Sequence, residues 1–171
     1  VSKMRMVNEQ GREVMQGGSR RSAIYASLNW KHQDIAEFIH AKDWYNFKIS
    51  GTDFTVGELK EKDFNYPAVL DMTNISVNYD TEWLETYKKT GDVGNIFLDN
   101  VKQALKTSEP GFSFNFYEKE NETLRNACTE VTSEDDSDVC NLGSINMSVI
   151  ESKEEFENIV ELSTKFLICG T

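Results

Sequence analysis

The strongest constraint on the fold is a nearly continuous apolar run at residues 23–28, which is followed directly by a helical pattern. A run of this kind is typical of a strand in a parallel sheet that is covered on both faces. Within residues 34–40, Ile35, Phe38 and Ile39 have the i, i+3, i+4 spacing of an amphipathic helix. The sequence therefore predicts a strand followed by a helix, which is the repeating unit of α/β folds.

The rest of the chain continues this alternation of short strands and helices. We expect strands at residues 74–77, 112–116 and 145–150, and helices at residues 82–87, 93–106 and 153–168, with Thr81 as an N-cap, Gly91 as a helix end and loops or short elements at 44–66. Strands separated by helices favour an α/β class with parallel strands and connecting helices. No closing element is apparent, so the sequence favours part of a larger sheet or barrel.

Composition argues against two kinds of partner. The chain has 18 Lys+Arg against 29 Asp+Glu and a formal net charge of −11, and it has no clustered basic stretch. Sequence-independent nucleic-acid binding needs a basic face that displaces counterions from phosphates. No apolar run is long enough to cross a membrane. We expect neither direct nucleic-acid binding nor a membrane partner.

The chain ends and the cysteines indicate a fragment from a reducing compartment. The chain begins at Val1 without a secretion signal and stops at Thr171, just after an apolar helical run. Three cysteines are an odd number, which argues against a disulfide framework and favours the cytoplasm. Cys169 lies in the apolar run and is expected in the core. Two histidines without clustered thiols predict no metal site.

The motif with the clearest chemistry alternates an amide, a thiol and a carboxylate at Asn126, Cys128 and Glu130. If this segment is extended, the three side chains point to one side. A neighbouring carboxylate opposes formation of a thiolate nucleophile. The arrangement suits a thiol that exchanges a hydrogen atom while the carboxylate takes a proton and the amide holds an oxygen. The alternative is a partly buried strand with an inert cysteine.

A second cysteine motif follows the first, and the two together resemble a known protein family. Cys140 follows twelve residues after Cys128, at the start of the sequence Cys-Asn-Leu-Gly-Ser-Ile-Asn. Together the two motifs resemble the active-site region of the catalytic (large) subunit of ribonucleotide reductase. Further segments resemble the same family in the same order, at residues 17–23, 31–39, 74–77, 110–114 and 166–171.

The resemblance implies a thiyl-radical enzyme built on a ten-stranded α/β barrel, with residues 1–171 forming an internal fragment of its catalytic barrel domain. It implies that Cys128 carries the thiyl radical and takes the 3′ hydrogen of the ribose. Glu130 takes the proton of the 3′-hydroxyl group, and Asn126 hydrogen-bonds the sugar. Cys140 resembles one half of the dithiol that reduces the 2′ position in the family, whose partner, normally on an earlier strand, is absent here.

A glycine-rich turn resembles the loop that links a deoxynucleotide specificity site to the substrate base. Its residues are Gly17, Gly18, Ser19, Arg20 and Arg21. Glycines let a backbone approach a ligand, and guanidinium groups stack on bases or pair with phosphates. Ser22 stands where the family often has glycine. The alternative is an ordinary turn with exposed arginines.

The resemblance also implies a radical source and partners. The short interval between the two cysteines is similar to the adenosylcobalamin-dependent class, although Cys-Thr-Glu also occurs in the class served by a separate dimetal small subunit. The implied partners are a ribonucleotide substrate, a deoxynucleotide effector, complementary reductase segments, a thioredoxin-like reductant and further copies of the enzyme in a homo-oligomer. A catalytically inactive split-gene or intein-flanking fragment that acts as an assembly module remains the alternative.

Overall fold

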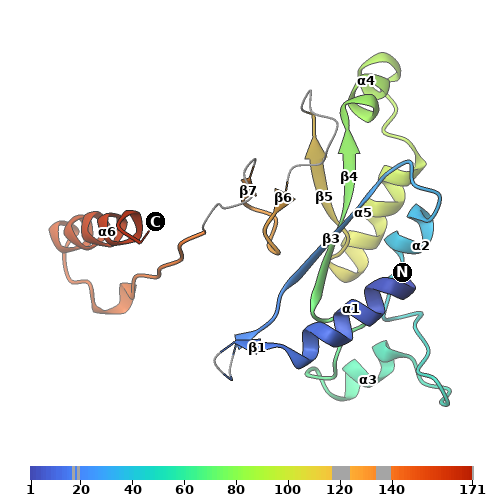
Figure 1. The fold of residues 1–171 in the computed structure, drawn as a ribbon, viewed down its shortest axis with the longest axis horizontal. Coiled ribbons are helices and arrows are strands. Elements are labelled where there is room, and N and C mark those ends of the chain that lie inside the picture. The colour runs from blue at the N-terminus through green and yellow to red at the C-terminus, as the bar shows by residue number, and fades with distance from the viewer. Residues whose placement is uncertain (17, 19, 117–123, 134–139, 171) are drawn as a thin grey trace. The chain divides into compact units, whose positions relative to one another are not determined.

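The structure is a computed structural model that describes residues 1–16, 18, 20–116, 124–133 and 140–170. The chain forms two compact units, Val1–Thr132 and Ser133–Thr171. The first holds a parallel sheet with its helices, and the second holds the Cys140 motif and the last helix (Figure 1).

A three-stranded parallel sheet forms the centre of the first unit. Its strands are β3 (Ile24–Asn29), β4 (Thr73–Asp80) and β5 (Gly111–Asn115), in the order β3-β4-β5. Helices α2 (Ile35–Ile39) and α3 (Val56–Lys62) connect β3 to β4, and α4 (Thr81–Thr90) and α5 (Asn95–Thr107) connect β4 to β5. The predicted parallel α/β class is confirmed, and the described sheet is open rather than closed into a barrel.

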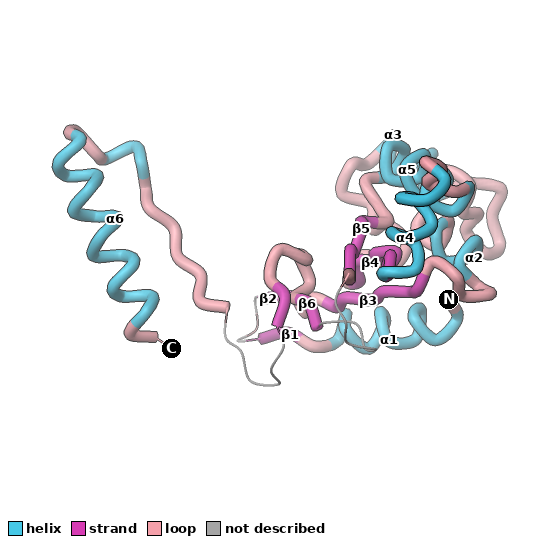
Figure 2. Tube along the Cα trace, turned by 90° about the horizontal axis from the view of Figure 1, so that it is seen from above, coloured by secondary structure: helices cyan, strands magenta, loops and turns pink. Residues whose placement is uncertain are grey.

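One face of the sheet carries the hydrophobic core. On β4 the side chains of Ile75, Val77 and Tyr79 are at most 1% exposed, and they pack with buried residues of α2 and with Trp83 of α4. Figure 2 shows α4 and α5 together on one side of the strands. Tyr79 also lies against the ring of Phe97 on α5, with a centroid distance of 5.3 Å. These contacts explain why the apolar positions alternate along β4.

The opposite face of the sheet is polar, which corrects the expectation of two apolar faces. Asn74, Ser76, Asn78 and Asp80 alternate with the core residues of β4 and therefore project from the other side. Every residue of β3 is half-buried rather than buried. Polar atoms interrupt the apolar run at Tyr25 and Ser27, which share the polar face with the buried Ser76 and Asn78 of β4.

Two helices of the first unit were missed by the sequence patterns. Helix α1 (Ser2–Glu13) packs against β3, and its buried residues are Asn8 and Gly11. These positions are polar or lack a side chain, while Met4 packs against the core and Met6 and Val7 are exposed, so the apolar residues of α1 do not mark its buried side. Helix α3 begins with a capping box formed by Thr55 and Glu58, within the segment expected to be loops.

Capping residues determine where α4 begins and ends. Its N-cap is Asp80, whose carboxylate accepts a hydrogen bond of 3.0 Å from the backbone N–H of Trp83. Thr81, the expected N-cap, is the first helical residue instead. Gly91 ends the helix as expected, with a φ of 71° that favours glycine.

The second unit consists of an irregular segment, a short 3₁₀ helix η1 (Met147–Val149) and the long helix α6 (Lys153–Ile168). The predicted helix is confirmed, whereas the strand expected at 145–150 is wrong. The side chain of Asn146 accepts a hydrogen bond of 3.1 Å from the N–H of Ser148 and so caps the 3₁₀ turn. Cys169 is exposed rather than part of a core.

None of the helices in the described part of the chain is long and apolar enough to span a membrane.

Candidate functional site

The Asn126 motif forms a turn rather than an extended segment. The turn connects two short strands that pair with each other, β6 (Leu124–Arg125) and β7 (Thr132–Ser133). The N–H of Thr129 donates to the carbonyl oxygen of Asn126 at 3.0 Å, and Thr129 has a φ of 71°. The N–H of Val131 donates to Oδ1 of Asn126 at 3.1 Å. An asparagine side chain that bonds a later backbone N–H favours turns over strands, so the expected strand geometry is wrong.

The turn still presents the three motif side chains from a few consecutive residues. Cys128 and Glu130 are exposed, and Asn126 is half-buried. Because Oδ1 of Asn126 accepts from Val131, its Nδ2 group is oriented as a donor, and no described residue accepts from it. The turn therefore offers an amide donor, an accessible thiol and a solvated carboxylate.

Two side-chain hydrogen bonds tie this turn to the parallel sheet. Nδ2 of Asn74, on the polar face of β4, donates to the carbonyl oxygen of Ala127 at 2.7 Å. Nη2 of Arg125 donates to the carbonyl oxygen of Phe114 on β5 at 3.1 Å. Sequence reasoning gave no role to Asn74 or Arg125. The signal that points to Asn74 is the alternation of polar and apolar residues at 74–77, which places its amide on the polar face of the strand.

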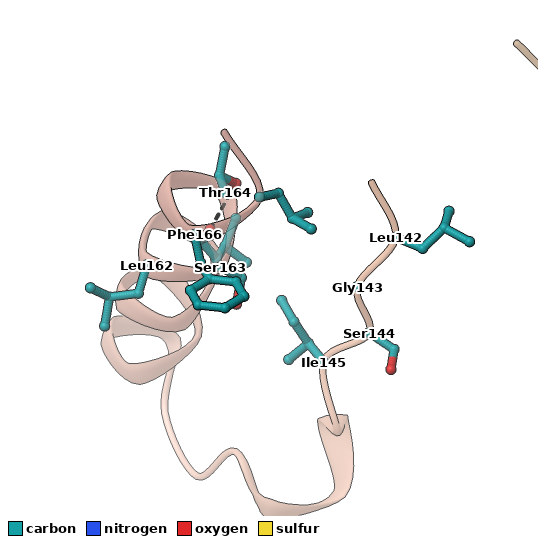
Figure 3. A pocket seen from close by; sticks show the side chains of 10 residues that line it. Leu142, Gly143, Ser144, Ile145, Leu162, Ser163, Thr164 and Phe166 are labelled. Carbon is teal, nitrogen blue, oxygen red and sulfur yellow. Dashed lines mark hydrogen bonds between the residues drawn. The ribbon is translucent and has the colours of Figure 1, made fainter. Parts of the chain in front are cut away.

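Cys140 lies in the second unit, in a segment fixed to α6. Cys140 is an exposed free cysteine. Nδ2 of the next residue, Asn141, donates to the carbonyl oxygen of Leu167 at 2.9 Å. The following residues and α6 enclose a largely apolar groove of about 610 Å³. Figure 3 shows Ile145 pointing toward α6, whereas Leu142 and Ser144 point away from it.

The structure describes part of the predicted arginine loop. Gly17 and Ser19 lie outside the described residues, and Gly18 has a φ of 75°. Arg20 and Arg21 are exposed and form β2 (Arg20–Arg21), which pairs with β1 (Met15–Gln16) in an antiparallel hairpin. Oγ of Ser22 donates to the carbonyl oxygen of Gly11 on α1 at 2.7 Å, which fixes the end of the loop to that helix.

Helix α1 is in turn fixed to the start of β4. Oδ1 of the buried Asn8 accepts from the N–H of Met72 at 3.0 Å and from Oγ1 of Thr73 at 2.9 Å. The guanidinium of Arg12 pairs with both carboxylate oxygens of Asp71 at 2.8 and 2.6 Å. Such two-point pairs are geometrically specific, so α1 holds a defined position at the start of β4, the strand that carries Asn74.

A cationic cavity adjoins the arginine loop. Arg21, Arg12 and Lys60 are among the side chains that line a space of about 460 Å³, together with the carboxylate of Asp71. Three positive groups around one negative group suit an anionic ligand. Sequence reasoning missed Arg12 and Lys60, because they lie on two helices that it did not predict.

Comparison with known proteins identifies the family. The family model described as ribonucleotide reductase, barrel domain, matches residues 1–57 and 77–169. The chain belongs to the ribonucleotide reductase family. All of the predicted site residues, from Gly17 to Arg21 and from Asn126 to Cys140, lie within the matched ranges of this reductase chain.

One curated relative covers nearly the whole chain. It is a vitamin B12-dependent ribonucleoside-diphosphate reductase of Thermoplasma acidophilum, which is 31% identical over 180 residues. The match covers 98% of this chain and 23% of the relative, so the chain spans about a quarter of that reductase. No solved structure gave a significant match. The resemblance to ribonucleotide reductases is thus confirmed at the level of the family.

The Arg12–Asp71 pair predicts a loss of stability in acid. Burial raises the pKa of Asp71, but hydrogen bonds from Arg12 and Asn8 outweigh it and hold the pKa below its ordinary value. Stabilisation from such a group is complete above the ordinary pKa, near 4, and is lost as the pH falls through the lowered value. We expect Asp71→Asn to cost about 2 kcal/mol at pH 7 and to flatten the acid decline. Urea unfolding between pH 7 and pH 2 measures both effects.

The exposed Asp53 provides the control for this measurement. Asp53→Asn removes the same charge and should leave both the stability at pH 7 and its acid decline unchanged. Equal acid declines in the wild type and in Asp71→Asn would show that the pair does not stabilise the fold.

Proposed function

We propose that this chain is part of a ribonucleotide reductase that converts ribonucleotides to 2′-deoxyribonucleotides by thiyl-radical chemistry, for DNA synthesis. The observation that carries the proposal is the match of the family model across the Asn126 turn and the Cys140 segment. The exposure of both cysteines supports it, because a radical thiol and a redox thiol must reach a substrate. In the whole enzyme the open sheet would form part of a ten-stranded barrel.

In this proposal the residues of the Asn126 turn act on the ribose. Cys128, as a thiyl radical, takes the hydrogen atom from C3′ and becomes a thiol. Glu130 accepts the proton of the 3′-hydroxyl group, and Nδ2 of Asn126 donates a hydrogen bond to an oxygen of the sugar. These roles match an amide donor, an accessible thiol and an exposed carboxylate.

Cys140 supplies part of the reducing equivalents. The 2′-hydroxyl group leaves as water, while Cys140 and a second thiol provided by a complementary segment give up two electrons and two protons and form a disulfide. Cys128 then returns its hydrogen atom to C3′ and is again a radical. The sum is ribonucleotide plus dithiol giving deoxyribonucleotide, disulfide and water. A thioredoxin-like reductant of the cytoplasm would restore the dithiol.

Adenosylcobalamin is the proposed radical source, because the relative is named as vitamin B12-dependent. When bound, this cofactor supplies the unpaired electron that Cys128 carries. The placement of Cys128 on an exposed turn fits this role, since its Sγ atom can be reached by an external radical source. The alternative source is a separate dimetal small subunit.

The arginine loop is proposed to respond to a deoxynucleotide effector. Arg21 borders a cationic cavity, and both arginines are exposed next to a glycine of positive φ. Guanidinium groups in such a place suit the phosphates or the base of a nucleotide. The hydrogen bond between Ser22 and Gly11 fixes the end of the loop to α1.

The proposal is tested by turnover of the assembled enzyme. We expect this chain, combined with the complementary reductase segments, to form deoxynucleotide from a ribonucleotide in the presence of effector, dithiol and adenosylcobalamin. Chromatography of the nucleotides measures the product. Turnover that needs a dimetal subunit instead of adenosylcobalamin would correct the radical source. A stable assembly that never turns over would favour the assembly-module alternative.

A further inference from the structure

We propose that Asn74 is a positioning residue that fixes the orientation of Cys128 through the peptide bond that precedes it. This inference rests on the proposed role of Cys128. Asn74 lies on β4, 53 positions before Ala127 in the sequence, and its Nδ2 atom donates to the carbonyl oxygen of Ala127 at 2.7 Å.

The placement of Asn74 on β4 explains why its side chain can reach the turn. Asn74 is the second residue of β4, and its neighbours Thr73 and Ile75 are buried on the core side. Alternation along the strand directs Asn74 to the polar face. Its backbone pairs in parallel register with Tyr25 of β3, so the Cα atom that bears the amide is held by the sheet. A rigid strand therefore presents this donor.

The contact affects Cys128 because the hydrogen bond is accepted by the carbonyl oxygen of the preceding residue, Ala127. The carbonyl of Ala127 belongs to the peptide unit whose plane also contains the N and Cα atoms of Cys128. A hydrogen bond to this oxygen restricts rotation of the whole plane. Beyond Cys128, the backbone is closed by the bond from Thr129 to Asn126. The backbone of Cys128 is thus held on both sides, which fixes the direction of the Cα–Cβ bond that carries the thiol.

The second anchor of the turn does not duplicate this restraint. Arg125 bonds the carbonyl oxygen of Phe114 and so holds β6, which ends three residues before Cys128. It leaves the peptide plane between Ala127 and Cys128 free to rotate. Asn74 is the described side chain that bonds this plane directly.

A positioning role predicts a large effect on rate with a small effect on stability. Asn74 is exposed, and a hydrogen bond of this kind contributes about 1 kcal/mol to folding. Transfer of a hydrogen atom requires reacting atoms in near-attack geometry, and a displacement of about 1 Å can cost about 100-fold in rate. Loss of the donor should therefore lower turnover far more than it lowers stability.

The kinetic test compares two Asn→Asp variants in the assembled reductase. Asn74→Asp keeps the size of the side chain but replaces its donor with an acceptor that repels the carbonyl of Ala127. We expect kcat to fall by about 10- to 100-fold while KM for the ribonucleotide stays within about twofold. Asn95→Asp, at the exposed start of α5, adds the same charge and should leave both constants unchanged. Asn74→Ala should behave like Asn74→Asp.

A second readout does not depend on activity. The ¹³C shift of the Ala127 carbonyl, measured by NMR on the full 171-residue chain, should change in both Asn74 variants and stay the same in Asn95→Asp. An unchanged shift would overturn the hydrogen bond. A changed shift with unchanged kcat would overturn the positioning role. If the wild-type assembly never forms deoxynucleotide, the proposed function fails, and with it the role of Asn74 in catalysis, while the shift still reports on the contact.

Discussion

Cys128→Ser is expected to abolish deoxyribonucleotide formation by the assembled reductase. A hydroxyl group of nearly the same size fits the turn, but serine does not carry the thiyl radical that the proposed mechanism needs. We expect turnover to fall by at least about 1,000-fold, which corresponds to about 4 kcal/mol in the activation barrier. Chromatographic measurement of product against time, at saturating substrate and effector, checks the result.

The exposed thiol of Cys169, in the second unit, provides a control for this substitution. Cys169 follows the end of α6 and has no role in the proposed chemistry. Cys169→Ser should retain full turnover, and both variants should show the circular dichroism and urea midpoint of the wild type. Deoxynucleotide produced at the wild-type rate by Cys128→Ser would refute the radical assignment.

The three strands of the parallel sheet and most helices could be predicted because their apolar residues recur with the period of a strand or of a helix. The spacing of Ile35, Phe38 and Ile39 matches α2, whose apolar side faces the core. Helix α1 could not be found in this way, because it is held by hydrogen bonds of Asn8 and by a close approach at Gly11. Contacts made by polar groups leave no hydrophobic period in the sequence.

The candidate site was predictable in its residues and not in its geometry. Asn126, Cys128 and Glu130 were found from their spacing, yet the assumption of an extended backbone was wrong. The reason is local, because the Asn126 side chain accepts the N–H of Val131 and closes a turn. The contact with Asn74 depends on the tertiary fold, which brings together residues 53 positions apart. Patterns among neighbouring residues cannot predict a contact between residues so far apart in the sequence.

The largest loss of stability is expected from Tyr79→Ala. Tyr79 is fully buried at the centre of the aromatic cluster on the core face, with ring centroids of Trp83 at 5.0 Å and Phe114 at 5.7 Å. Truncation removes these contacts and leaves a cavity, which typically costs about 3–5 kcal/mol for a large aromatic side chain. Urea unfolding followed by circular dichroism should show a lower midpoint. Phe64→Ala, at a position that is 87% exposed, should stay within about 0.5 kcal/mol of the wild type.

The variant Tyr79→Phe measures the contribution of the hydroxyl group to stability separately from that of the ring. The hydroxyl oxygen accepts a hydrogen bond of 3.1 Å from Nδ2 of Asn100, so its loss should cost about 1 kcal/mol at pH 7. Burial raises the pKa of Tyr79 to about 12. The stabilisation that comes with this raised pKa is complete below pH 10, the ordinary value, and is lost as the pH rises toward 12. Wild-type stability should therefore fall more steeply than that of Tyr79→Phe above pH 10, and parallel curves would show that the Tyr79 hydroxyl is not buried in solution.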